Sequence, residues 1–307
     1  MTQREVEQRI ERDLRAVSDK PVEALSLIRA KDGVHVYRAL YGGVPVVMKH
    51  FEREGDRREI LNYRILQCRG VPTLRVLACG LSTLCMEDIG ASESWRLGAA
   101  EDMADIDVAA GLAHWYFALH ENGTDVPELD ALYAEYDAIT RKSLAMLMER
   151  LPEARATFQY MLERFDELRH MIDSPSYTLT YNNFYWVNLA VRNDRRAAMM
   201  FDFNLMGKGY RFADIRNVCS ALSETAGAAF VDAYNDLYIQ KHGHSREAEE
   251  DIERQVDELA SPLFSLISAY AREDFPAWAD NAKALVVDGT LLERTKRVLS
   301  FQPEHQG

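Results

Sequence analysis

The residues of this chain best suited to chemistry begin with a lysine inside an apolar segment. Lys49 lies in the run VPVVMKHF, directly after a two-glycine turn, and Glu59 follows on a segment with helical spacing. A lysine in such a strand is either an edge residue that faces solvent or a buried cation that an acid must hold. In the second case Lys49 can contact nucleotide phosphates while Glu59 fixes its position. We therefore predict that Lys49 and Glu59 pair.

A second candidate site centres on Asp202, which lies in the largely apolar run AMMFDFN. Burying a carboxylate costs free energy unless it is paired or bound to a metal. Asn188 precedes Asp202 by fourteen residues and begins another apolar run, NLAV. Two oxygen ligands that converge from the arms of a hairpin suit Mg²⁺, with phosphates completing the coordination shell. We predict that Asn188 and Asp202 share one magnesium ion.

The segment CMEDIG, residues 85–90, ends a β-rich region with two acids and a glycine. Two interpretations are open for it. In the first, the backbone around Glu87 and Ile89 hydrogen-bonds the edge of an adenine. In the second, Glu87 and Asp88 are solvated charges of a turn between two parts of the chain.

The elements that must position these residues follow from the spacing of apolar positions. Residues 3–18 have the 3.6-residue period of an amphipathic helix, and strand patterns separated by Lys-Asp-Gly and Gly-Gly turns follow to residue 51. A helix over 56–68 and two short strands, 73–78 and 83–87, complete the β-rich part. Beyond residue 90 the pattern is helical, interrupted by one β-rich stretch. We predict an α+β protein with a small β-rich lobe over 1–90 and a larger, mainly helical lobe over 91–307 that contains a hairpin at 177–204.

In this order, the residues resemble the family of small-molecule kinases that includes the aminoglycoside phosphotransferases and choline kinases. The resemblance covers residues 25–220, and its pieces are Lys49, Glu59, MEDIG at 86–90, residues 181–188, and Phe201-Asp202-Phe203 followed by Asp214. It implies a bilobed protein-kinase-like fold, ATP and Mg²⁺ as cofactors, and Lys49, Glu87 and Ile89 as nucleotide-binding positions. We expect Asp214 to have a structural role at the start of a helix.

Three departures from the family pattern bear on activity. The segment expected to cover the nucleotide, residues 29–37, has Gly33 as its only glycine. Tyr181 replaces the usual histidine, at a position that mostly packs or bonds to backbone. Asn183 stands where the family has its catalytic aspartate, and no acidic residue lies between Asp173 and Asp194 to replace it. An amide oxygen can accept a hydrogen bond from a substrate hydroxyl but cannot take its proton. The resemblance thus implies an ATP-dependent phosphotransferase with impaired turnover. The alternative is a pseudokinase that binds a nucleotide or another ligand without turnover.

Composition narrows the choice of partners. The chain has 49 acidic and 36 basic side chains, a formal net charge of −13, which disfavours nucleic acid as a partner. An acidic surface attracts cations, so we expect a small, cationic hydroxyl compound, such as an aminoglycoside, an amino sugar or a choline-like alcohol. Acids that line its cleft, or simply face solvent on helices, are Asp130, Glu135 and Asp137.

The cysteines and the apolar runs bear on the cellular location of the protein. Its four cysteines show no C-x-x-C spacing, so neither a zinc site nor a disulfide framework is expected. The first residues are charged and lack the apolar core of a signal peptide, and no apolar run reaches membrane-spanning length. We expect a cytoplasmic protein without a membrane partner. A helical scaffold with coincidental motifs is the remaining, least favoured interpretation.

Overall fold

A computed structural model describes residues 1–127 and 129–300 of the chain. Its contacts divide the chain into two compact units. The first unit comprises Met1–Val126, Tyr181–Met206 and Arg216–Ser245. The second comprises Pro127–Thr180, Gly207–Ile215 and the chain from Arg246 onward.

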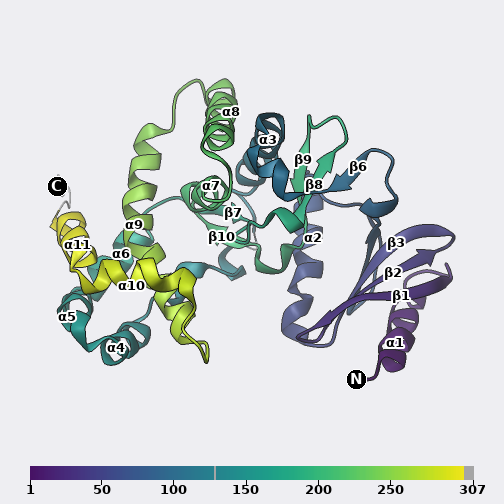
Figure 1. Ribbon diagram of the computed structural model, residues 1–307, viewed down its shortest axis with the longest axis horizontal. Coiled ribbons are helices and arrows are strands. Elements are labelled where there is room, and N and C mark those ends of the chain that lie inside the picture. Colours follow the sequence, from purple (N-terminus) through teal and green to yellow (C-terminus); the bar gives the residue numbers. More distant parts are fainter. Residues whose placement is uncertain (128, 301–307) are drawn as a thin grey trace. The chain divides into compact units, whose positions relative to one another are not determined.

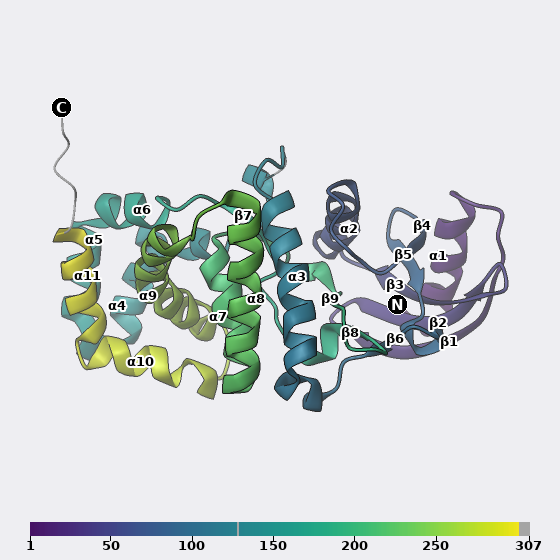
Figure 2. The same ribbon diagram turned by 90° about the horizontal axis from the view of Figure 1, so that it is seen from above.

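The first unit contains a five-stranded antiparallel sheet in the order β1-β2-β3-β5-β4. Figure 1 labels β1, β2 and β3 of this sheet, and Figure 2 labels all five strands. Its strands are β1 (Val22–Lys31), β2 (Val34–Tyr41), β3 (Val44–Phe51), β4 (Val76–Cys79) and β5 (Thr83–Glu87). Gly42 and Gly43 connect β2 to β3 with φ angles of 58° and 79°. This pair of positive angles defines the tight hairpin turn that matches the twist of a sheet, as the Gly-Gly signal predicts.

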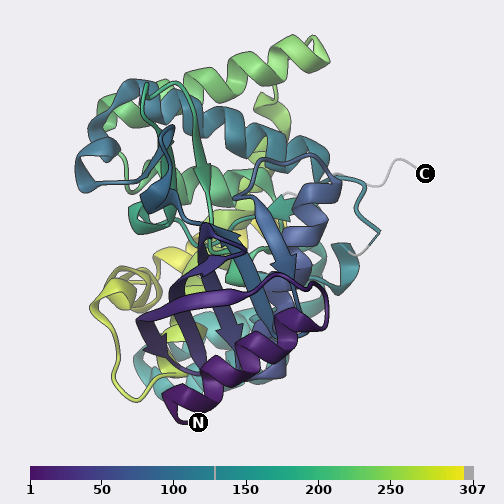
Figure 3. The same ribbon diagram turned by 90° about the vertical axis from the view of Figure 1, so that its right-hand side faces the viewer.

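Helix α1 (Gln3–Arg15) covers one face of this sheet (Figure 3). Its apolar stripe of Val6, Ile10 and Leu14 is buried in a cluster with Tyr37 and Met48 of the sheet. Successive residues of a strand point to opposite faces. The neighbours of these two core residues, Val36 and Lys49, therefore belong to the face that α1 does not cover.

The first unit also contains a second, three-stranded sheet in the order β6-β8-β9 (Figure 1). Its strands are β6 (Trp95–Leu97), β8 (Leu189–Arg192) and β9 (Ala198–Met200). Helix α2 (Arg58–Cys68) follows β3, while α3 (Ile106–Asn122) and α8 (Glu224–His242) lie side by side (Figure 2). Strand β6 is absent from the sequence prediction because three residues are too few to show a period.

The second unit is mainly helical. Its helices are α4 (Arg141–Arg150), α5 (Arg155–Glu163), α6 (Phe165–Ile172), α9 (Glu247–Tyr270), α10 (Asp280–Val287) and α11 (Thr290–Ser300), and α7 (Arg211–Cys219) begins in this unit and ends in the first. It also contains a pair of short strands, β7 (Thr178–Thr180) and β10 (Gly207–Gly209). The hairpin expected at 177–204 therefore has β8 and β9 as its arms, while β7 pairs elsewhere.

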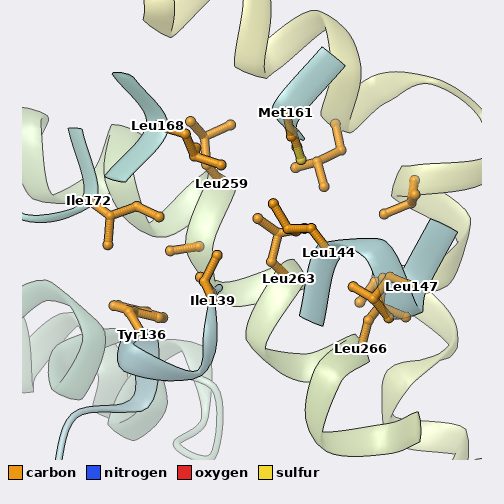
Figure 4. Packing of buried hydrophobic residues seen from close by; sticks show 14 of the residues in the cluster. Tyr136, Ile139, Leu144, Leu147, Met161, Leu168, Ile172, Leu259, Leu263 and Leu266 are labelled. Atoms are coloured by element: carbon orange, nitrogen blue, oxygen red, sulfur yellow. The ribbon is translucent and has the colours of Figure 1, made fainter. Parts of the chain in front are cut away.

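The core of the second unit is an apolar cluster to which α4, α5, α6 and α9 contribute, together with Tyr136 and Ile139 of the segment before α4 (Figure 4). We expect Leu263→Ala, at a fully buried position of α9, to lower the free energy of unfolding by about 2–5 kcal/mol, because it leaves a cavity. The matched control is Val287→Ala on α10, where the side chain is 42% exposed. It should change stability by less than about 0.5 kcal/mol. Equal effects in denaturant unfolding would contradict this assignment of the core.

The α+β class expected from the sequence is confirmed, since a small antiparallel sheet comes first and most of the remaining chain is helical. Among the described residues, no helix is both long enough and apolar enough to cross a membrane.

Candidate functional site

Lys49 lies on β3 between two carboxylates. Its Nζ is 2.5 Å from Glu59 Oε2 on α2 and 2.5 Å from Asp202 Oδ1, which follows β9. The predicted pairing of Lys49 with Glu59 is therefore present in the structure. Lys49 is 9% exposed and Glu59 is fully buried, so water screens this ion pair little. The carboxylate of Asp202 is the more accessible of the two.

Burial and the neighbouring charges shift the pKa values of Lys49 and Glu59 in opposite directions. Burial lowers the pKa of the Lys49 ammonium, but the charges of Glu59 and Asp202 outweigh it and raise that pKa above its ordinary value. Burial raises the pKa of the Glu59 carboxyl to about 7, despite the opposing effect of Lys49. Lys49 therefore keeps its positive charge at neutral pH.

The raised pKa of Glu59 predicts a pH dependence of stability. Between the ordinary pKa of 4.5 and the folded value of about 7, the unfolded chain releases a proton that the folded chain retains. The contribution of Glu59 to stability is therefore lost as the pH rises through this window. In denaturant unfolding at several pH values, wild type should lose stability relative to Glu59→Gln as the pH rises from 4.5 to 7. A constant difference between the two proteins would show that Glu59 does not titrate there.

Helix α2 also contacts the turn that follows Asp202. Asn62 Nδ2 donates to the carbonyl of Phe203 at 2.7 Å, and the rings of Tyr63 and Phe203 meet edge to face with centroids 4.7 Å apart. The position of Asp202 is therefore tied to α2 at several points. The sequence prediction missed Asn62 and Tyr63, because their spacing is that of an ordinary helix face.

Asn188 and Asp202 lie at the ends of the two hairpin arms. Asn188 directly precedes β8, and its carbonyl accepts a hydrogen bond from the N–H of Phe201 at 2.9 Å, which extends the ladder between β8 and β9. The backbone of Asp202 has φ 64° and ψ 68°. This left-handed conformation is rare for residues other than glycine. Such strained backbone is concentrated at functional sites. The carboxylate of Asp202 and the amide of Asn188 are oxygen donors of the kind that Mg²⁺ accepts.

Asn183 follows β7 in a loop without regular structure. It is half-buried, and its side chain makes no hydrogen bond to any other described residue. Two hydrogen bonds fix the start of this loop. The Tyr181 hydroxyl donates to the carbonyl of Phe201 at 2.6 Å, and Asn182 Nδ2 donates to the carbonyl of Leu205 at 3.1 Å. Tyr181 thus bonds to backbone, as expected for its position. The amide of Asn183 remains able to bond to a ligand.

Two adjoining cavities of the first unit meet at Lys49, Glu59 and Asp202. One, of about 340 Å³, is lined mainly by charged residues of β1 and of the segment after β3. The other, of about 300 Å³, is mostly apolar, and Val36, Val47, Met86 and Phe201 are among its lining residues. Both volumes lie at the lower end of the range of about 300–1,000 Å³ that is typical of ligand pockets.

The segment after β5 borders the apolar cavity. Glu87 and Ile89 both line it, but the Glu87 carboxylate also accepts from the N–H of Arg75 at 2.7 Å. Asp88 is not a solvated charge: it is 7% exposed, and Arg38 Nε donates to it at 2.6 Å. That ion pair holds this segment against β2.

The remaining candidates belong to the second unit. Asp214 is buried in the first turn of α7, in keeping with the structural role expected for it. Glu135 and Asp137 lie on the short 3-10 helix Glu135–Ala138, where Asp137 is exposed and 4.0 Å from Arg169. The side chain of Asp130 falls outside the described part of the chain.

No family model and no curated protein matches this sequence. Solved structures do match it. Macrolide 2′-phosphotransferase MphH from Brachybacterium faecium is 16% identical with a TM-score of 0.55, over 92% of this chain and 98% of that one. A choline/ethanolamine kinase family protein from Mesorhizobium loti is 15% identical with a TM-score of 0.56, over 96% and 99%. Spectinomycin phosphotransferase in complex with ADP and spectinomycin is 12% identical with a TM-score of 0.51, over 95% and 98%.

These likenesses extend over nearly the whole of each chain. They show that the protein has the protein-kinase-like fold of aminoglycoside phosphotransferases and choline kinases, so the resemblance expected from the motifs is confirmed at the level of the fold. A purely helical scaffold is excluded. Fold alone does not establish function, which must come from the site.

Proposed function

We propose that this protein binds ATP with Mg²⁺ and transfers the terminal phosphoryl group to a hydroxyl of a small, cationic molecule, at a rate limited by Asn183. The observation that carries the proposal is the buried contact of Lys49 with both Glu59 and Asp202, at the junction of an apolar and a charged cavity. Spectinomycin phosphotransferase, which has the same fold, binds ADP.

Each part of the site fits one part of the nucleotide. The apolar cavity suits an aromatic base, with backbone groups around Glu87 and Ile89 as its hydrogen-bonding edge. Lys49, held by Glu59, would contact the phosphates, while Asn188 and Asp202 would hold Mg²⁺, which supplies charge neutralisation during transfer. The small-molecule acceptor is an inference from relatives of the same fold, and its positive charge an inference from the net charge of −13.

Asn183 would position the acceptor rather than activate it. Its amide oxygen can accept a hydrogen bond from the attacking hydroxyl, but the proton has no side-chain base there to receive it. Phosphoryl transfer depends largely on positioning and on electrostatic stabilisation. Slow turnover is therefore compatible with this residue.

A pseudokinase is the second candidate function, and the observation that favours it is the asparagine at position 183. No carboxylate occupies position 183, and none lies between Asp173 and Asp194 in the sequence. A protein of this kind would keep nucleotide binding through Lys49 and Asp202 without transferring phosphate.

Two measurements separate these candidates. Thermal-shift titration with ATP and Mg²⁺ should raise the melting temperature, because a ligand that binds only the folded state stabilises it. No shift at millimolar ATP would reject both candidates. ADP release against a panel of hydroxylated cations then distinguishes them: acceptor-dependent release supports the phosphotransferase, and its absence with every acceptor supports the pseudokinase.

A further inference from the structure

The tip of the β1–β2 hairpin covers the charged cavity without the glycine-rich backbone that cradles phosphates in many nucleotide sites. The turn consists of Asp32 and Gly33, with φ angles of 53° and 84°, and is too short to form a loop of free N–H groups. The N–H of Glu52 donates to the carbonyl of Gly33 at 2.9 Å, which closes the turn against the end of β3. Donors for a phosphate must therefore come from side chains.

A β-bulge in β1 places the side chain of Arg29 at this cavity. The register of β1 against β2 shifts between Leu27 and Arg29, so that Ile28 and Arg29 both line cavities although they are consecutive. Bulges commonly redirect a side chain in this way. Beyond the bulge, Arg29 pairs with Val36, which pairs with Lys49, so the three residues stand in one row across the sheet. Arg29 thus shares the cavity face with Lys49.

Arg53 lines the same cavity from the segment that follows β3. It lies just after β3, and its side chain passes over Gly33: a Cβ at that glycine would lie 3.5 Å from Arg53 Nε. Arg53 and Arg29 both line the charged cavity, both are exposed, and neither makes an ion pair or side-chain hydrogen bond with another described residue. In a chain with 13 more acidic than basic side chains, two such guanidinium groups beside one cavity require an explanation.

The cavity also contains carboxylates, three of which lie beside a lysine. Glu59 and Asp202 share Lys49, and Asp32 lies 3.8 Å from Lys31. Positive charge therefore remains available at the rim, on Arg29 and Arg53. Guanidinium groups bind phosphate oxygens through paired, charge-assisted hydrogen bonds.

We propose that Arg29 and Arg53 form a side-chain clamp for the β- and γ-phosphates of the nucleotide and take the place of a backbone cradle. This inference rests on the proposed nucleotide site and adds two residues to it. Because the clamp contacts only the distal phosphates, it selects nucleoside di- and triphosphates over monophosphates. Part of the affinity should then depend on ionic strength.

Titration calorimetry of ATP and AMP in Mg²⁺ tests the clamp. Arg29→Gln and Arg53→Gln should each weaken ATP binding about tenfold, as expected for the loss of a charged hydrogen bond, and change AMP binding less than about twofold. Arg29→Lys should retain part of the ATP affinity, because it keeps the charge but not the paired geometry. The control is Arg4→Gln, since Arg4 is exposed on α1, which covers the opposite face of the sheet. It should match wild type.

The outcomes separate this inference from the proposed function. If wild type binds ATP but both glutamine variants retain full affinity, or if ATP and AMP weaken equally, the clamp is wrong and the nucleotide site stands. If wild type binds neither nucleotide, the proposed function fails. Inorganic tripolyphosphate then tests the clamp alone, and binding that is lost in the Arg29→Gln, Arg53→Gln double variant would support it, whereas no binding would reject it.

Discussion

Asn183→Asp should raise the rate of phosphoryl transfer by about 10²–10⁴-fold, the contribution that general-base catalysis typically supplies. The reason is local: a carboxylate at this position can take the proton of the attacking hydroxyl, which the amide cannot. ATP affinity should change little, since Lys49, Asn188 and Asp202 are untouched. The measurement is ADP release with an acceptor panel, with intrinsic ATP hydrolysis as a substitute while the acceptor is unidentified.

The control for added charge is Asn281→Asp, on the exposed surface of α10, which should leave the rate unchanged. Equal rates for wild type and Asn183→Asp, in hydrolysis and across the acceptor panel, would reject the idea that Asn183 is the only defect. A high rate from wild type itself would place the base elsewhere or show that none is needed. If only Asn183→Asp gains activity, the chain is a kinase that has lost its catalytic carboxylate.

Asp202→Ala should abolish the effect of Mg²⁺ on ATP binding. Asn188 is the one other metal ligand that we propose, and a neutral amide alone holds a divalent ion weakly. The variant should remain folded, because Lys49 keeps its contact with Glu59. Calorimetry with and without Mg²⁺ measures the difference directly.

The matched control is Asp194→Ala, at the far end of the same hairpin, where the carboxylate pairs with Arg192 in solvent. It should bind ATP with the same Mg²⁺ dependence as wild type. If Mg²⁺ strengthens ATP binding equally in Asp202→Ala and wild type, the metal assignment is wrong.

The features that the sequence predicted well are local ones. The Gly42-Gly43 turn follows from two residues, and the strands on either side follow from their β-branched character. The contact of Lys49 with Glu59 was predictable because a strand followed at once by a helix leaves few other places for either side chain. The hydrogen bond from Tyr181 to backbone was likewise expected from the position of that residue in a motif.

What the sequence did not predict depends on register and on distant partners. The direction of the Arg29 side chain is not predictable from the sequence, because a bulge breaks the alternation of β1 and no residue type marks that bulge. The pairing of β7 with β10 joins segments that are far apart in the chain, and three-residue strands have no detectable period. The ion pair of Asp88 is not visible in the local sequence either, because its partner, Arg38, is fifty positions away.

The attachment of α2 to the turn after β9 has a practical consequence for spectroscopy. Because Asn62 and Tyr63 hold Phe203, a ligand that pulls Asp202 away from Lys49 must also strain or shift α2. Cys68 stands exposed at the end of that helix, whereas Cys85 is buried with its thiol pKa raised to about 12 by that burial. Thiolate is the reactive form of cysteine, so a dye should attach to Cys68 in preference to Cys85. Cys68 therefore offers an attachment point on α2 for a fluorescent label, whose emission can be tested for a response to nucleotide and Mg²⁺.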